Sequence, residues 1–586
     1  MVASSPAFAK ALQAYQRGEL QNCLDQLGPL LRRQAPDANV LLVAAQCHTK
    51  LDQKLEAARL YARVADAQPA NRRMFQLLAA RLYSQLDMAE QGLALMRQIA
   101  GPDAGGQKDA LFQSFDMEEN KTFRRLLRSQ LCLDEIEASD TWVRHGAEVG
   151  TDPAFLTMDD PYDHMLWCEQ EEINSRQMKM AAGKPFTAES RRNRRALPHR
   201  FGDKIRVGYL SSDFADQHPT MRLFQGVLLG HDSSKFEIHL FCHTPEDIRA
   251  QDHGLRRTYP NLHDILAMDD ATARDFIRSF DLDILVDLKG HTRDVRADLI
   301  NSGLARIQVA YLGFPGSAYG IDCDYAISDP IVTPDRSKAF YHEKLCRLPE
   351  TYQANDNVHR PLPPPASRAA LGLPEDAFVL ASFNMVRKIT PQTARLWARL
   401  LKAIPGSVLW MLCSGKQRQA NFTAFMAGCG IEPERLFFTV AESYIPHIAR
   451  LQAADLGLDT HPYNGHTTTS DKLWAGLPVI TFKGSNFASR VSESLLTALG
   501  VPQLVAETPD AMVDLAAELA RDRATLAALR QRIAENRLHA PLFDTARFTQ
   551  HLERAFEMMV EREKAGLEPD HIDVPALAPR LTSFRA

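Results

Sequence analysis

The chain has 586 residues, of which 45% are hydrophobic and 24% are charged, and its formal net charge is −5. This length predicts several domains, and the lack of a basic excess argues against a nucleic-acid-binding protein. No apolar run approaches the ~20 residues of a membrane-spanning helix, and the N-terminus lacks the apolar core of a signal peptide.

A repeat occupies the N-terminal part of the chain. Pro36, Pro69 and Pro102 are each 33 residues apart, close to the tetratricopeptide period of about 34. Pairs of amphipathic helices are expected between them, such as residues 39–50 and 54–67. Stacked repeats of this kind leave a concave groove. We therefore expect tetratricopeptide-like repeats over residues 1–102, which either hold a partner protein or merely cap the rest of the chain. Residues 103–200 predict a helical connector.

A first α/β lobe is expected over residues 201–360. Its strand candidates alternate with helical stretches, which indicates a parallel sheet with right-handed crossovers. These candidates are residues 205–212, 237–242, 283–287, 307–312 and 324–327. Polar or glycine-rich segments follow three of them, where parallel sheets bind ligands. The segments are DFADQHPT (213–220), KGHT (289–292) and GFPG (313–316).

A proline-rich segment, residues 360–367, predicts a semi-rigid linker to a second α/β lobe over residues 368–566. Its strand candidates are residues 378–382, 408–413, 436–439, 455–459 and 478–482. The first strand leads into FNMVRKITP, residues 383–391. The end of this lobe reads as helical, with Thr508 and Pro509 at one helix start and Asp544 or Thr545 at the last. Residues 567–586 form a tail.

The second lobe is organised around residues 455–476, ADLGLDTHPYNGHTTTSDKLWAG from Ala454 on. A short apolar strand, a polar turn with a glycine, and a hydroxyl-rich helix start follow one another. Free amide groups and the positive end of the helix dipole then point at whatever lies above the strand, which predicts an anion site. Thr467 and Thr468 add hydroxyl donors, and His466 adds a ring that can donate to a phosphate oxygen. An ordinary Ser/Thr helix cap is the alternative.

Several chemistries lack their motifs. There is no G-x-G-x-x-G after a strand and no G-x-x-x-x-G-K-[ST], so dinucleotide redox and P-loop chemistry lose support. Asp281, Asp283, Asp322 and Asp324 flank apolar strands, where strand caps are favoured over metal ligands. The nine cysteines form no C-x-x-C pair, so we expect reduced thiols in a cytoplasmic protein.

Together these segments resemble the O-GlcNAc-transferase-like, SPINDLY-type protein glycosyltransferases, glycosyltransferase family 41. The resemblance rests on NGHTT followed by D and LWAG (464–476), on FNMVRKITP, and on the three segments of the first lobe. It covers roughly residues 206–566. It implies a GT-B fold, in which two Rossmann-like lobes hold a nucleotide sugar on the C-terminal lobe and an acceptor on the N-terminal side.

The resemblance also implies functions for single residues. Lys388 would neutralise the departing nucleoside diphosphate, because a fixed cation in a closed cleft stabilises the charge that develops there. Nucleotide-sugar binding would fall to His447, Arg450, His466, Thr467, Thr468 and Asp471. The acceptor side would comprise His218, Thr220, His291, Pro315 and Gly316. His218 would position or partly deprotonate the acceptor. His291 lines that side or only orders its loop.

The leading prediction is an inverting, metal-independent protein O-glycosyltransferase that moves GlcNAc from UDP-GlcNAc to Ser or Thr, with the repeat groove holding the protein acceptor. Three departures from the family pattern concern the site: one extra residue before His218, Met385 in place of glutamine, and Tyr444 in place of lysine. Alternative donors are GDP-fucose, UDP-glucose transferred to Asn, or an activated sugar for flagellin. A non-catalytic adaptor is a further alternative. The oligomeric state, a homo-oligomer included, stays open.

Overall fold

The structure is a computed structural model that describes residues 5–86, 88–100, 108–149, 153–182, 186–580 and 582–584. It divides into two compact units, Met1–Asp159 with Gly415–Phe425, and Asp160–Ser414 with Met426–Ala586. Pro102, the last of the repeat prolines, lies outside the described residues. Among the helices of the described ranges, none has the length and apolar character needed to cross a membrane.

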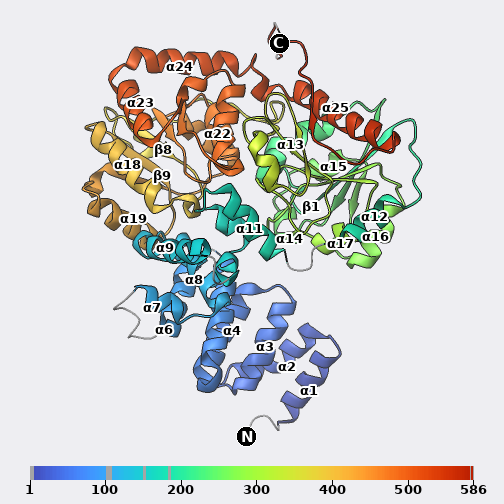
Figure 1. Cartoon of the computed structure of the whole chain (residues 1–586). Coiled ribbons are helices and arrows are strands. Elements are labelled where there is room, and N and C mark those ends of the chain that lie inside the picture. Colours follow the sequence, from blue (N-terminus) through green and yellow to red (C-terminus); the bar gives the residue numbers. More distant parts are fainter. Residues whose placement is uncertain are drawn as a thin grey trace. The chain divides into compact units, whose positions relative to one another are not determined.

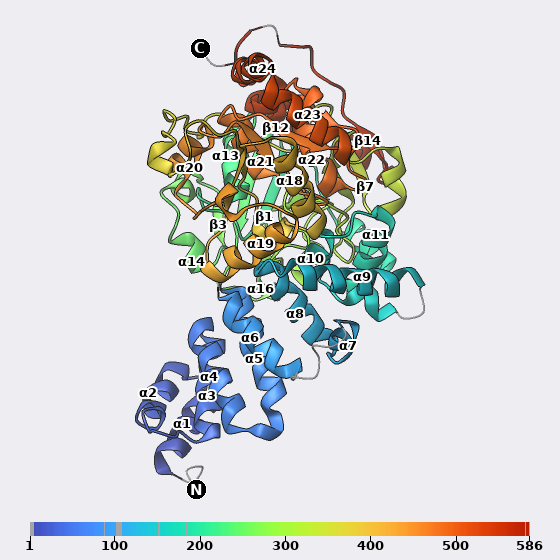
Figure 2. The ribbon, with the colours of Figure 1, turned by 90° about the vertical axis from the view of Figure 1, so that its left-hand side faces the viewer.

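The first unit is built from helices. They are α1 (Pro6–Gln16), α2 (Leu20–Leu31), α3 (Ala38–Lys50), α4 (Lys54–Ala67), α5 (Arg72–Gln85), α6 (Ala89–Ala100), α7 (Lys108–Gln113), α8 (Met117–Ser129) and α9 (Leu133–Val149). From α1 to α6 each helix packs against the next one (Figure 2). The fully buried alanines Ala44, Ala45, Ala57 and Ala58 let α3 and α4 approach closely. These two helices match the predicted pair.

The second unit contains two parallel sheets. The first has the strand order β14-β7-β6-β5-β4-β1-β2-β3, and the second has β10-β9-β8-β11-β12-β13. The strands of the first sheet are β1 (Ile205–Ser211), β2 (Phe236–Cys242), β3 (Leu262–Asp264), β4 (Ile284–Asp287), β5 (Ile307–Ala310), β6 (Tyr325–Ser328), β7 (Lys344–Arg347) and β14 (Ile572–Asp573). Those of the second are β8 (Val379–Ser382), β9 (Val408–Leu412), β10 (Leu436–Thr439), β11 (Leu456–Leu458), β12 (Val479–Phe482) and β13 (Val505–Ala506). The predicted class, a helical region before two α/β lobes, is confirmed.

The inner strands β4, β5, β6, β8 and β11 are buried along their whole length because helices surround the sheets (Figure 1). The helices of the first lobe are α13 (Pro219–Gly230), α14 (Glu246–Arg249), α15 (Leu255–Thr258), α16 (Asp270–Arg278) and α17 (Ala297–Asn301). Those of the second lobe are α18 (Pro391–Ala403), α20 (Tyr444–Leu451), α21 (Thr467–Trp474), α22 (Phe487–Ala498), α23 (Pro509–Arg521) and α24 (Arg523–Asn536). Helix α19 (Lys416–Gly428) follows β9 in the chain and belongs mostly to the first unit. Three further helices, α10 (Pro161–Met165), α11 (Glu171–Ala181) and α12 (Ala188–Arg195), precede the first sheet.

Each sheet has one point where the strand order changes direction, and this point locates the binding crevice. In the first sheet it lies between β1 and β4, and in the second between β8 and β11. The chain leaves β1 and β4 at Ser212 and Leu288, and it leaves β8 and β11 at Phe383 and Asp459. Three segments singled out for chemistry start at or next to Ser212, Leu288 and Phe383, and residues 455–476 span Asp459, whereas GFPG follows β5.

The last helix, α25 (Thr545–Lys564), returns to the first lobe and packs against α13 (Figure 1). It begins as predicted: the Asp544 side chain accepts a hydrogen bond from the Arg547 amide. Thr508 likewise caps α23, with Pro509 in its first turn. Beyond α25 the tail adds β14 to the edge strand β7, which the sequence did not predict because β14 has only two residues.

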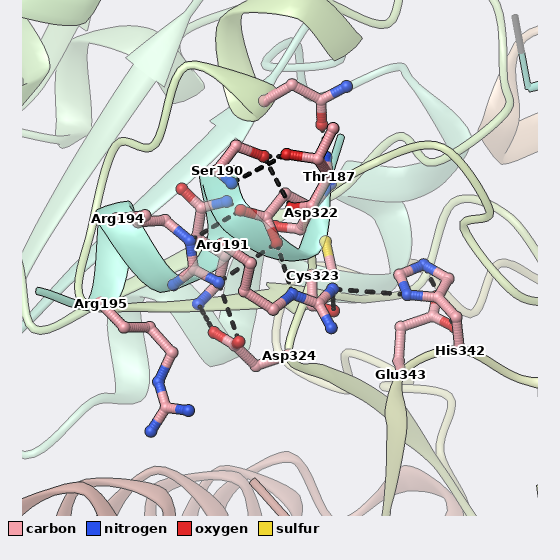
Figure 3. A network of polar contacts seen from close by, with 12 residues as sticks. Thr187, Ser190, Arg191, Arg194, Arg195, Asp322, Cys323, Asp324, His342 and Glu343 are labelled. Carbon is pink, nitrogen blue, oxygen red and sulfur yellow. Dashed lines mark hydrogen bonds and ion pairs between the residues drawn. The ribbon is translucent and has the colours of Figure 1, made fainter. Parts of the chain in front are cut away.

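The arginines of α12 fasten this helix to the first lobe (Figure 3). The Arg194 guanidinium donates to Asp322 and to Asp324 at 2.8 Å each, and Arg191 also reaches Asp322. Burial alone would raise the pKa of Asp322, yet Arg194 and Arg191 hold it below its usual range. Arg191 and Arg194 therefore form a packing surface against the first lobe. Asp322 and Asp324, which precede β6, therefore form ion pairs with these arginines.

Candidate functional site

A buried carboxylate organises the turn after β11. Asp459 is 5% exposed, and its Oδ1 accepts hydrogen bonds from the amides of Thr460 (2.9 Å) and Gly465 (2.7 Å). Its Oδ2 accepts from the Thr481 hydroxyl at 2.9 Å. The turn that leads to α21 is therefore fixed from inside, at the point where the second sheet changes direction.

The start of α21 lies against the segment that follows β8. The Thr468 hydroxyl donates to Asn384 Oδ1 at 2.5 Å. Gly465 makes this approach feasible: a Cβ there would meet Thr468 Oγ1 at 2.6 Å and Asn384 Oδ1 at 2.7 Å. Thr467 and Thr468 remain partly exposed. The helix start thus presents hydroxyl groups beside the crevice, as the predicted anion site requires.

His466 precedes α21 and is stacked on Tyr463, with ring centroids 4.8 Å apart. Burial lowers the pKa of this imidazole well below its usual value, and the charge of Lys388 lowers it further. The ring is therefore neutral at pH 7. Its Nε2 is buried without a hydrogen-bond partner within the described chain. A neutral imidazole carries one N–H, so the unused nitrogen donates to a ligand oxygen in the tautomer that places the proton there.

Lys388 contacts the turn after β11. Its ammonium group donates to the Asn464 carbonyl at 2.8 Å and lies 4.0 Å from the centroid of the Tyr463 ring. Burial lowers the pKa of Lys388 to about 7; Asp459 opposes this shift and Lys472 adds to it. A lysine in this condition gains its proton fully only when an anion arrives.

The residues predicted to hold the nucleoside lie on α20 and α21, which pack against each other (Figure 2). The Asp471 carboxylate accepts a hydrogen bond from the Tyr444 hydroxyl at 2.8 Å, and an Arg360 nitrogen lies 3.6 Å away. Tyr444 therefore occupies one oxygen of Asp471. Arg360, in the predicted linker, is buried and donates to Ser470.

His447 and Arg450 lie one turn apart on α20 and contact each other. An Arg450 nitrogen is 3.1 Å from His447 Nδ1, and the same guanidinium donates to the Val440 carbonyl at 2.7 Å. Burial lowers the pKa of His447 to about 4. Arg450 is itself 1% exposed, so in this structure it orients the neutral imidazole of His447 and has little surface for direct contact with a ligand.

On the first lobe, His218 caps α13 through its Nδ1, which accepts from the Thr220 amide at 3.3 Å. Its Nε2 lies 3.6 Å from the Asp213 carboxylate. Asp213 also accepts from the Thr220 hydroxyl at 3.0 Å and from the Lys289 ammonium at 2.5 Å. Burial lowers the pKa of His218 although Asp213 opposes the shift, so its imidazole is neutral at pH 7. Because Nδ1 accepts from the Thr220 amide, the ring proton lies on Nε2, which faces Asp213.

The remaining residues predicted for the acceptor side have more apolar surroundings. His291 contacts the Phe314 ring edge to face at 5.1 Å, and burial lowers its pKa to about 4. Pro315 is buried, and Gly316 faces Met165 and Met178. Phe314 also shares a hydrophobic cluster with Tyr463. Their geometry fits loop ordering between the lobes, whereas His218 and Thr220 lie together at the end of β1.

The sequence analysis did not predict several residues that contact the site. Arg387 forms an ion pair with Asp163 of α10, and Glu169 pairs with His461 at 3.0 Å. Glu171 accepts from Ser337 of the first lobe at 3.0 Å and lies 3.6 Å from Arg490 of the second. The α10–α11 segment therefore joins both lobes beside Lys388. Nothing in the local pattern near residue 163 indicates these contacts, which depend on tertiary packing.

The comparisons with known proteins agree with this geometry. The family described as Glycosyl transferase family 41 matches residues 190–364 and 363–552. A probable UDP-N-acetylglucosamine–peptide N-acetylglucosaminyltransferase, SEC of Arabidopsis thaliana, is 33% identical over 378 residues, which are 63% of this chain and 38% of that protein. The Caenorhabditis elegans UDP-N-acetylglucosamine–peptide N-acetylglucosaminyltransferase is 26% identical over 485 residues, 63% of this chain and 42% of that protein. The chain thus spans about two fifths of the length of these relatives.

A solved structure extends the likeness in fold. A mutant of the Thermobaculum terrenum O-GlcNAc transferase superposes with a TM-score of 0.70 at 24% identity, covering 90% of this chain and 98% of that one. The match includes the helical region as well as the two sheets.

The crowding at Gly465 yields a direct prediction. Gly465→Ala forces a Cβ to within 2.5–2.7 Å of Thr469, Thr468 and Asn384, so it should destabilise the protein by about 1–3 kcal/mol and displace the start of α21. Denaturant unfolding of the full chain measures the effect. Gly428→Ala is the matched control, because a Cβ there meets no atom within 4 Å. Equal stability of the two variants would contradict the close approach.

Proposed function

Because the chain belongs to glycosyl transferase family 41, we propose that it transfers a sugar from a nucleotide-sugar donor to a protein side chain. The observation that carries the proposal is a pair of contacts where the second sheet changes direction: Lys388 donates to the Asn464 carbonyl, and Thr468 donates to Asn384. A buried amine with a lowered pKa, helix-start hydroxyls and the unused nitrogen of His466 form a receptor for a diphosphate.

The finer assignment follows the contacts of each residue. In the proposal, Lys388, His466, Thr467 and Thr468 stabilise the diphosphate as it leaves. His447, oriented by Arg450, packs against the base, and Asp471 accepts from the ribose hydroxyls. The acceptor oxygen attacks the anomeric carbon as the bond to the phosphate oxygen breaks, with inversion. The hydroxyl proton passes to a base, for which His218 is our candidate: its imidazole is neutral, and Nδ1 accepts the proton once the Thr220 amide has moved away from that atom.

The donor we propose first is UDP-GlcNAc, with Ser or Thr as acceptor, since the relatives are named for UDP-N-acetylglucosamine and peptide. We propose that no metal is required, because Lys388 and the start of α21 supply positive charge where the leaving group forms. In the proposal, the acceptor side is supported by the loops that carry His291, Pro315 and Gly316. The groove of α1–α6 holds the acceptor protein. We expect the reaction in the cytoplasm.

A second candidate is a family relative with another nucleotide sugar. The Tyr444 hydroxyl already occupies Asp471, so a ribose must share or displace it, and Met385 is 38% exposed where the family has an amide. Both features favour a donor different from that of the plant and animal relatives. GDP-fucose, UDP-glucose and an activated sugar for flagellin remain the alternatives.

A thermal-shift panel tests the proposal. UDP, GDP, CMP and their sugar conjugates are added to the purified full chain without metal, and a ligand that binds the folded state raises the melting midpoint in proportion to RT ln(1 + [L]/Kd). We expect a shift with UDP and UDP-GlcNAc. A shift confined to GDP or CMP compounds would replace the donor within the same fold. No shift with any compound would favour a non-catalytic adaptor.

The lowered pKa of Lys388 predicts proton uptake on binding. At about pH 8.5 the free amine, with a pKa of about 7, is mostly neutral, and an adjacent diphosphate raises that pKa. Nucleotide binding should therefore take up close to one proton, and affinity should fall as pH rises above 7. Calorimetry in two buffers of different ionisation enthalpy measures the uptake.

The control for this experiment is Lys388→Met, which should bind more weakly and without proton uptake at this position. If the wild type binds nucleotide with the same heat in the two buffers, Lys388 does not gain a proton on binding.

A further inference from the structure

Arg222 is a cation on the first lobe that the assignments above leave unused. It lies in the first turn of α13, and its amide donates to the carbonyl of His218 at 3.0 Å. Because α13 begins where the chain leaves β1, this side chain emerges at the point where the first sheet changes direction. Arg222 is thus placed beside the proposed acceptor site.

The face of its guanidinium is held by the other lobe. The group lies over the Tyr444 ring, 4.3 Å from the centroid, and the Tyr444 hydroxyl is fixed by Asp471. Helix α13 also contacts α21, which carries Asp471. Stacking on an aromatic ring uses the flat face of a guanidinium and leaves its N–H donors free along the edge.

Those edge donors have no partner within the described residues. The Arg222 side chain forms no ion pair or hydrogen bond there, and its Nε is buried without an acceptor. Neighbouring cations are engaged: Lys289 with Asp213, Arg360 with Ser470, and Arg450 with Val440. A partly buried guanidinium with unused donors is costly unless an anion arrives.

The charge of Arg222 also affects a histidine on each lobe. After burial, which is the larger cause, Arg222 contributes to lowering the pKa of His218 and of His447. One of these histidines belongs to the proposed acceptor side and the other to the proposed nucleoside side. The guanidinium therefore lies within electrostatic range of both.

We propose that Arg222 is an anion-binding residue that contacts a phosphate of the bound donor or a carboxylate carried by its sugar. The inference rests on the proposed function, because a nucleotide sugar supplies such a group between these two histidines. The planar fork of a guanidinium suits bidentate recognition of either anion, and Tyr444 sets its orientation. Tyr444 thereby gains a positioning function in place of the lysine it replaces.

Calorimetry on the full chain tests this inference. The probes are uridine, UDP, guanosine, GDP, cytidine and CMP, together with UDP-glucose and UDP-glucuronate, which differ only in a sugar carboxylate. Arg222→Met should weaken phosphorylated probes roughly 10- to 100-fold and leave nucleosides unchanged, since a charge-assisted hydrogen bond is lost. Arg222→Lys should lie between this variant and wild type. A loss larger for UDP-glucuronate than for UDP-glucose would identify the carboxylate as the source.

The control variant is Arg274→Met on α16, which removes an arginine whose ion pair within the described ranges is with exposed Asp275, and this variant should bind as wild type does. Melting of the ligand-free variants verifies folding. If Arg222→Met binds every anionic probe as wild type does, or loses nucleosides and nucleotides equally, the inference is wrong and Arg222 only braces the lobes. If wild type itself binds no nucleotide, the proposed function has failed as well, so the two failures are distinguishable.

Discussion

The hydrogen bonds to the Asp459 carboxylate hold the turn on which the rest of the candidate site depends. They fix Gly465 and the start of α21, and they place one negative charge within reach of both Lys388 and Lys472. Burial lowers the pKa of Lys472 to about 8 and that of Lys388 to about 7. One carboxylate cannot neutralise two buried amines, so the end of β11 is short of negative charge. A bound anion would complete the balance.

A related arrangement recurs on the first lobe. Asp213, after β1, accepts from Lys289, which follows β4, and from Thr220. In each lobe a buried carboxylate therefore follows a strand next to the point of changed direction and fixes the loop that carries the polar groups. Glu171 of α11 then joins the two lobes through Ser337 and Arg490. Groups held in this way need little rearrangement when charge develops, which is the condition for electrostatic stabilisation.

The sequence predicts the parts of this structure that depend on local pattern. Apolar runs identify β1, β2, β4 and β8, and the Thr508 and Asp544 caps place the starts of α23 and α25. The candidate residues of the second lobe were found by motif and lie around two strand ends. Short edge strands such as β14 carry too little signal to predict. The pairs Asp163–Arg387 and Arg222–Tyr444 join residues more than 200 apart in the chain, so only the folded arrangement reveals them.

The claim at the centre of this account is that nucleotide binds between the segment after β8 and the start of α21. Hydrogen–deuterium exchange of the full chain, with and without the nucleotide that shifts its melting midpoint, tests it most directly. We expect slower exchange in residues 384–390 and 459–471, with little change in α1–α6. Protection confined to α1–α6, or to the sheet edges away from β8 and β11, would contradict it.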